Sequence, residues 1–139
     1  SLQPVLSSAS TLLRRGPTLE IPRAVICIGN DAGDLDSVVS AIALAYWQSQ
    51  YQIADAAAEA TQNALYVPVA PFDRQDFKLR QDARVLFGHI REELPVGSDG
   101  SPVDLLCWDE IEDLVISKWR GHTGIALTDH NKCSSSVAA

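Results

Sequence analysis

Three short stretches of the chain could bind a cation, and each directly follows a run of apolar residues. They carry carboxylates, amides and one imidazole: Asn30, Asp34 and Asp36 in the first stretch, Asp109 and Glu110 in the second, and Asp129, His130 and Asn131 in the third. Oxygen ligands with a nearby imidazole suit Mg, Mn or a similar divalent ion. Carboxylates held close together repel one another, so we expect a cation among them.

Each stretch also has a purely structural interpretation. Asp34 and Asp36 could be turn and helix-cap residues after a strand. Asp109 could belong to an ordinary acidic helix start, because helices favour carboxylates in their first turn. The third stretch could be a polar turn in which His130 is solvated. The chemical interpretation therefore depends on whether the fold brings the three stretches together.

Apolar periodicity predicts the elements that would position these residues. Apolar, β-branched runs indicate strands, and apolar residues three or four positions apart indicate helices. We expect strands at 23–28, 64–70, 103–108 and 123–128, and helices at about 37–48, 74–94 and 111–119. Pro68 predicts that the second strand is an edge or strand-end piece. Alternating strands and helices predict an α/β fold with a mainly parallel sheet flanked by helices. In such sheets ligands bind beyond the carboxyl ends of the strands, where all three stretches would meet.

Composition excludes several classes of protein. The chain has 139 residues, a net charge of −7 and an ordinary apolar fraction of 46%. An acidic chain offers no general attraction for nucleic acid or anionic membranes. No apolar run approaches the roughly 20 residues of a membrane span. The three scattered cysteines argue against a disulfide framework and for a reducing compartment, so we expect a cytoplasmic protein.

The first 19 residues have two interpretations. The segment contains Ser, Leu and two Arg but no acidic residue, which faintly resembles a transit peptide. The favoured alternative is a short amphipathic helix that covers the domain. We therefore divide the chain into residues 1–19, an N-terminal extension or covering helix, and residues 20–139, a metal-binding α/β domain.

Taken together, the motifs resemble those of the DHH phosphoesterase superfamily. The stretches "IGNDAGDLDSVVSAIA", "WDEIED" and "LTDHN" occur in that superfamily's order and approximate separations, over roughly residues 20–131. Asn30 stands where many members of the superfamily have His. In this respect the chain resembles the exopolyphosphatase and Prune branch. The segment "PVAPFDRQDFKLRQDARVLF" resembles that branch as well. The resemblance implies the fold of a DHH-type N-terminal domain.

The resemblance also implies a site for two divalent ions, Mn or Mg. By matching motifs, Asn30 and Asp34 would face the first ion, and Asp36 and His130 the second. Asp109 would bridge the two. The implied activity is hydrolysis of a phosphoanhydride, removing the terminal phosphate of inorganic polyphosphate by attack of a water that the two ions activate. The substrate would be polyphosphate or another small phosphoanhydride.

The catalytic residues implied by the resemblance are Asp109, His130 and Asn131, with Asp129 supporting His130. Asn131 replaces a second His of the family motif; an amide can hydrogen-bond phosphate but cannot become an imidazolium. The family's fourth metal-binding Asp and its basic C-terminal domain would lie beyond Ala139. The sequence thus resembles an apparently truncated enzyme, weak or inactive alone. Two alternatives remain: a catalytically impaired, Prune-like binding or regulatory protein, and a receiver-like domain with one metal, which leaves His130 unexplained.

Overall fold

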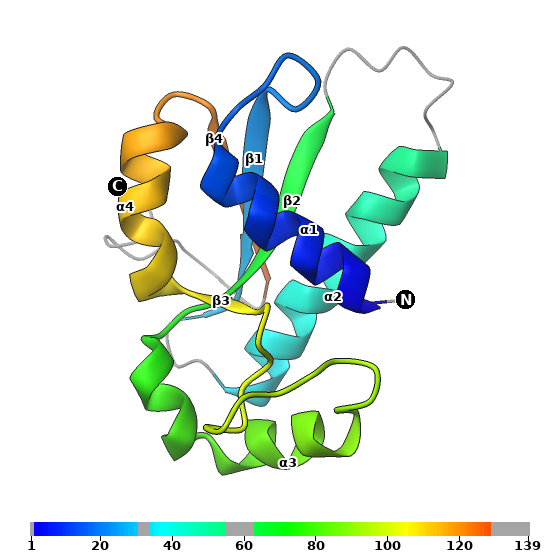
Figure 1. The fold of residues 1–139 in the computed structure, drawn as a ribbon, viewed down its shortest axis with the longest axis vertical. Helices are drawn as coiled ribbons and strands as arrows, with labels where there is room; N and C mark the ends of the chain where they lie inside the picture. Colours follow the sequence, from blue (N-terminus) through cyan, green and yellow to red (C-terminus); the bar gives the residue numbers. More distant parts are fainter. Residues whose placement is uncertain (1, 31–33, 55–62, 129–139) are drawn as a thin grey trace.

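The computed structural model describes residues 2–30, 34–54 and 63–128. Helices and strands alternate along most of the described chain (Figure 1). In order, the elements are α1 (Leu2–Arg15), β1 (Arg23–Ile28), α2 (Leu35–Ala54), β2 (Ala64–Ala70), the 3-10 helix η1 (Arg74–Leu79), α3 (Gln81–His89), β3 (Leu106–Cys107), α4 (Trp108–Lys118) and β4 (Thr123–Leu127).

The four strands form one sheet in the order β3-β2-β1-β4, and every pairing is parallel. The predicted α/β fold with a parallel sheet is therefore confirmed. The register aligns the carboxyl ends of the strands, since Ile28 lies opposite both Val69 and Leu127, and Ala70 lies opposite Cys107. Whatever follows each strand consequently begins at the same edge of the sheet.

Branched and small apolar side chains explain why β1 lies at the centre. Its sequence is RAVICI, and five of these six residues are buried or half-buried. A strand covered on both faces needs such a continuous apolar run. The predicted bounds of β1 and β2 are confirmed, and the fourth strand ends one residue earlier than the predicted 128.

Two predictions about the strands need correction. The third strand, expected at 103–108, is reduced to Leu106–Cys107, because α4 begins at Trp108. Pro68 lies in β2, which is an inner strand rather than an edge strand. Proline is tolerated there because β2 pairs with β3 only at Val69 and Ala70, so the β3 side of the sheet is unpaired at Pro68.

The core consists of two clusters of buried side chains. The first joins alternate residues of β1 and β2, among them Ile26 and Val67, to Ile111 and Trp119. The second joins α2 to the aromatic side chains of η1 and α3. Helix α1, which crosses in front of the sheet in Figure 1, contributes to both, because Ala9 and Leu13 belong to the first cluster and Leu6 to the second.

The helix expected at 74–94 is interrupted. Residues 74–79 form the 3-10 helix η1, and α3 begins at Gln81. Arg80, between them, has φ −100° and ψ 75°, which is outside the helical region. The break lets Phe77 and Phe87 join one cluster, while Leu79, within the range predicted as one helix, is 72% exposed.

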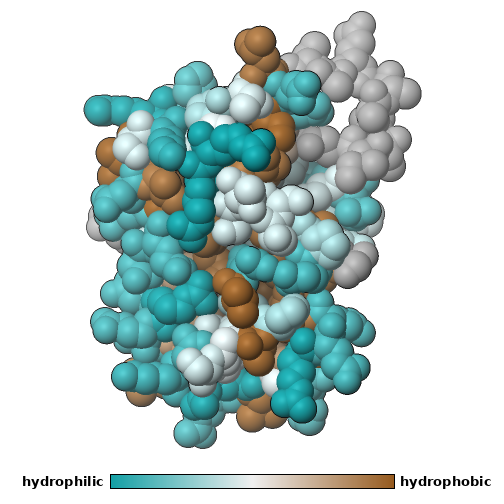
Figure 2. Space-filling view, in the orientation of Figure 1, coloured by the Kyte–Doolittle hydropathy of each residue, from teal (hydrophilic) through white to brown (hydrophobic). Residues whose placement is uncertain are grey.

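The visible surface agrees with an ordinary globular chain. Figure 2 shows a mostly hydrophilic face with scattered apolar side chains over the elements drawn in Figure 1. Across the described ranges, no helix is both long enough and apolar enough to cross a membrane.

Candidate metal site at the carboxyl edge of the sheet

Ser37 joins the end of β1 to the start of α2. This side chain is fully buried, and its Oγ accepts a hydrogen bond of 3.2 Å from the backbone N–H of Asn30. The same hydroxyl donates to Oδ1 of Asp34 at 2.9 Å. Gly29 makes the close approach possible, since a Cβ at that position would lie 2.3 Å from Cβ of Ser37. The end of β1 and the start of α2 are thereby locked together.

Asp34 lies directly before α2 and organises its first turn. Its backbone carbonyl accepts from the N–H groups of Ser37 and Val38, at 3.1 and 3.2 Å. A carboxylate at this position is favoured by the positive end of the helix dipole. Asp36 lies in the first turn of α2, and both carboxylates are exposed. Asp34 therefore has the structural role expected of it at the helix start, whereas Asp36 lies within the first turn, and the exposure of both leaves them accessible to a cation.

Asp109 and Glu110 lie in the first turn of α4, directly after β3. Oδ1 of Asp109 accepts a hydrogen bond of 3.1 Å from the backbone N–H of Arg74, and the side chain is exposed. Oε1 of Glu110 accepts from the backbone N–H of Cys107 at 2.8 Å, which closes the first turn as in a capping box. The two adjacent carboxylates thus differ in role, because Glu110 points back to the strand end.

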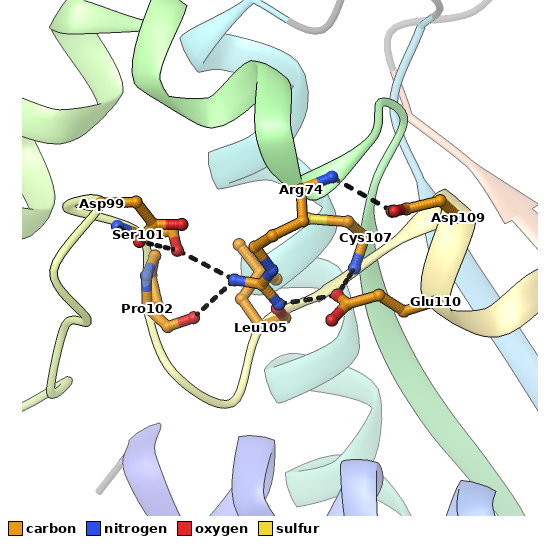
Figure 3. A network of polar contacts seen from close by, with 8 residues as sticks. All are labelled: Arg74, Asp99, Ser101, Pro102, Leu105, Cys107, Asp109 and Glu110. Carbon is orange, nitrogen blue, oxygen red and sulfur yellow. Dashed lines mark hydrogen bonds and ion pairs between the residues drawn. The ribbon is translucent and has the colours of Figure 1, made fainter.

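Arg74 holds this corner together (Figure 3). Its Nη2 donates to Oε1 of Glu110 at 2.7 Å and also to the carbonyl of Leu105. Its Nη1 donates to Oγ of Ser101 at 2.9 Å and to the carbonyl of Pro102 at 3.2 Å. A guanidinium offers five N–H donors in a planar fork, which suits several acceptors in different directions.

The hydrogen bonds of this network keep both Arg74 and Asp99 charged. Burial works to lower the pKa of Arg74, but the hydrogen bond to Glu110 and the nearby negative charges raise it overall, so the guanidinium stays charged. For Asp99, burial works to raise the pKa, yet hydrogen bonds from Ser101 and the charge of Arg74 hold it below its ordinary 3.8. Asp99 is therefore ionised at neutral pH, and its Oδ1 accepts hydrogen bonds from the backbone N–H and the hydroxyl of Ser101.

The buried cysteines of β1 and β3 do not take part in this chemistry. Burial raises the pKa of both Cys27 and Cys107 to about 12. A thiol with such a pKa is almost wholly protonated at neutral pH, so it is neither a nucleophile nor a ready metal ligand. These two residues are packing residues of the core.

The fold brings the first two stretches to the same edge of the sheet. Asp34 and Asp36 follow the central strand β1, and Asp109 follows β3, two strands away. The third stretch follows β4, which is the other neighbour of β1. Its residues Asp129, His130 and Asn131 lie outside the described residues, so their predicted roles stay predictions.

The donors in the described part of the chain fit a hard divalent cation in kind. They are carboxylates and one amide, the oxygen ligands that Mg and Mn prefer. Within residues 2–30, 34–54 and 63–128, however, no group of three or more His, Cys, Asp or Glu side chains lies close enough to hold an ion. The described donors alone could therefore supply only part of a coordination shell.

Two important residues were missed by reasoning from the sequence. Ser37 is one of them, because nothing in its spacing indicates a bond back to residue 30. Arg74 is the other; it begins the helix predicted at 74–94 and lies in the segment that resembles the family, but neither observation indicates its role. Its partners Ser101 and Glu110 are 27 and 36 residues further along the chain, and no local pattern reveals contacts at that distance.

Comparison with known proteins agrees with the motifs. No family model matches the chain. It is 32% identical over 114 residues to "Exopolyphosphatase PRUNE1" of Rattus norvegicus and 30% identical over the same length to that of Mus musculus. In both cases the match covers 82% of this chain but only 21% of the relative, so the chain spans about a fifth of the proteins it matches. With its motifs and its parallel sheet, the chain is a distant relative of the Prune branch of the DHH phosphoesterases.

Proposed function

We propose that the chain provides a divalent-metal site for phosphoanhydride hydrolysis, with inorganic polyphosphate as the substrate class. The observation that carries this proposal is the position of Asp34, Asp36 and Asp109, all exposed at the carboxyl edge of an all-parallel sheet. Ligands of such sheets bind at this edge. The relatives' name, exopolyphosphatase, supports the same substrate class for this chain.

The chain's own residues would hold and orient the reactants. Two divalent ions, when bound, would supply Lewis acidity to the phosphoryl oxygens and a lowered pKa for an attacking water. Asp34, steadied by Ser37, and Asn30 would hold the first ion. Asp36 and His130 would hold the second, with Asp109 between the two.

Asn131 would donate a hydrogen bond from its amide to a substrate phosphate. An Asn side chain can donate in this way at any pH, but it cannot provide positive charge or a proton. We therefore expect weaker stabilisation of the developing negative charge than a protonated His would give. The net charge of −7 also repels a polyanion, so the 139 residues should bind the cation more readily than they turn over polyphosphate.

The test is Mn²⁺ titration by calorimetry, together with phosphate release from polyphosphate in Mn²⁺ or Mg²⁺. Asp34→Asn and Asp109→Asn should each weaken Mn²⁺ binding by at least about tenfold, the scale of losses at metal sites. Glu20→Gln is the matched control, because this carboxylate is exposed but precedes β1 and so lies towards the opposite edge of the sheet. Mn²⁺ binding by Asp109→Asn equal to that of the wild type would contradict the proposal.

A second candidate function is favoured by Asn131. A chain with the metal ligands but without the second His of the motif could bind metal and phosphate without turning over, as a Prune-like binding or regulatory protein would. The two functions separate in the same experiment. Metal-dependent phosphate release that Asp109→Asn abolishes supports the enzyme, whereas tight Mn²⁺ and polyphosphate binding with no release supports the binding protein.

A further inference from the structure

The sheet alone cannot fix the direction of Asp109. Strand β3 is only two residues long and pairs with β2 only at Val69 and Ala70. A ladder of this length gives little resistance to rotation of the helix that follows. Asp109 is the second residue of that helix, so its position depends on contacts beyond the strand pairing.

Arg74, which follows β2, supplies several of these contacts, and the backbone N–H of Trp108 supplies another by donating to the carbonyl of Phe72 at 3.2 Å. Arg74 starts η1, soon after β2 ends, and its guanidinium bridges the loop before β3 and the first turn of α4 (Figure 3). On one side it holds Ser101 and the carbonyls of Pro102 and Leu105, and on the other it holds Glu110. The side chain is 24% exposed, so these bonds are partly shielded from water.

The same residue binds Asp109 through its backbone. The N–H of Arg74 donates to Oδ1 of Asp109, so the protein holds this carboxylate at one oxygen. Glu110, paired with the guanidinium, closes the helix start on the N–H of Cys107. One arginine thus fixes the carboxylate directly and also the helical turn that carries it.

We propose that Arg74 is a positioning residue for Asp109, acting through the Glu110 ion pair and through its own backbone N–H. The inference deepens the proposed function and rests on it in one respect, namely that Asp109 is a metal ligand. Carboxylates that bind metals are themselves held by hydrogen bonds, and loss of such support lowers metal affinity about 10- to 100-fold.

The first test needs no metal. Amide hydrogen exchange at residues 74 and 107 reports the two backbone bonds that end on Asp109 and Glu110. Arg74→Lys, which keeps the charge but removes the fork, should speed exchange at both amides about tenfold or more. Glu110→Gln should do the same at residue 74 while its amide oxygen still accepts from Cys107. Arg91→Ala, an exposed arginine beyond α3, is the matched control and should change neither. Unchanged exchange in Arg74→Lys would overturn the proposal.

The second test asks whether Arg74 acts through Asp109. Arg74→Lys should lower Mn²⁺ affinity about tenfold in the wild-type chain and cause no further loss in the Asp109→Asn background. Such coupling is expected when one residue works through the other. A loss that persists in the Asp109→Asn background would indicate a general disturbance of the fold and would overturn the positioning role.

The two proposals can fail separately. If the wild-type chain binds no Mn²⁺, the proposed function fails, and the exchange measurement alone decides whether Arg74 fixes Asp109. If the wild type binds Mn²⁺ and Arg74→Lys binds it equally well with unchanged exchange, only the positioning role fails. Circular dichroism and the melting temperature of each variant establish that the comparisons are between folded proteins.

Discussion

The buried hydroxyl of Ser37 fixes the end of β1 relative to the start of α2. Ser37 accepts from the N–H of Asn30 and donates to Asp34, so it connects the end of β1 with the residue that opens α2. Buried polar groups are kept in such places because losing one partner leaves the other unsatisfied. The position of Asp34 is therefore a consequence of how closely the backbone around Gly29 can approach the helix.

The first prediction concerns Gly29→Ala. A Cβ at this position would lie 2.3 Å from Cβ and 2.7 Å from Cα of Ser37. Because one of these atoms belongs to the backbone, the helix start has to move, and we expect a loss of about 3 kcal/mol in the free energy of unfolding. The displaced Ser37 should also loosen Asp34. Urea denaturation measures the first effect, and Mn²⁺ titration the second.

Gly88→Ala is the matched control for Gly29→Ala. Gly88 is an exposed residue of α3, and a Cβ there would meet no other atom within 4 Å. Alanine is a better helix former than glycine, so this variant should gain about 0.5 kcal/mol. Equal urea midpoints for the two variants would show that the close contact at Gly29 does not constrain the fold.

At the scale of elements, the sequence predicted what depends on local pattern. The apolar runs of β1, β2 and β4 were recognised because each is long enough to show its period. The length of the third strand was predicted too long. The apolar run at 103–108 includes Trp108, but α4 begins at that residue and Glu110 closes its first turn. An apolar run alone cannot show where a strand gives way to a helix.

Long-range contacts were beyond the reach of the sequence. The ends of β1 and β3 could be predicted to meet at one edge, since topology rules require it. The hydrogen bonds of Arg74 at that edge could not be predicted, because Arg74 and Glu110 come together only once β2 and β3 pair. The packing of α1 against the sheet could not be predicted either, because its amphipathic pattern does not identify the residues it contacts.

The second prediction concerns the anchoring of α1. Leu13 is fully buried in the first cluster, and its carbonyl accepts a hydrogen bond of 2.8 Å from Nε1 of Trp119 at the end of α4. Leu13→Ala should cost about 2–5 kcal/mol in the free energy of unfolding, because it leaves a cavity in a packed core. Leu79→Ala, at a side chain that is 72% exposed, should change it by less than about 0.5 kcal/mol. Similar losses from both substitutions would mean that α1 is not part of the core.

At the scale of the whole molecule, the negative charge of the chain favours binding of a cation. The chain carries −7 overall, and the edge that would bind a cation gathers exposed carboxylates from two different strand ends. Where such carboxylates lie close together without a counter-ion, their mutual repulsion raises the free energy of the folded state. A cation bound at this edge would remove the repulsion and would favour the folded state over the unfolded one.

The last prediction is that Mn²⁺ raises the melting temperature of the whole chain. Binding to the folded state alone adds about 2.7 kcal/mol at a free concentration of about 100 times Kd. For a chain of this size we expect a rise of several degrees, on the order of 5–15 °C. EDTA should reverse the rise, and NaCl at equal ionic strength should reproduce little of it, because screening acts on all charges alike. Asp109→Asn should lose most of the Mn²⁺ effect, whereas Glu20→Gln should keep it. Calorimetry that finds the same shift with NaCl as with Mn²⁺ would mean that the carboxylates at this edge are a diffuse negative surface and bind no specific ion.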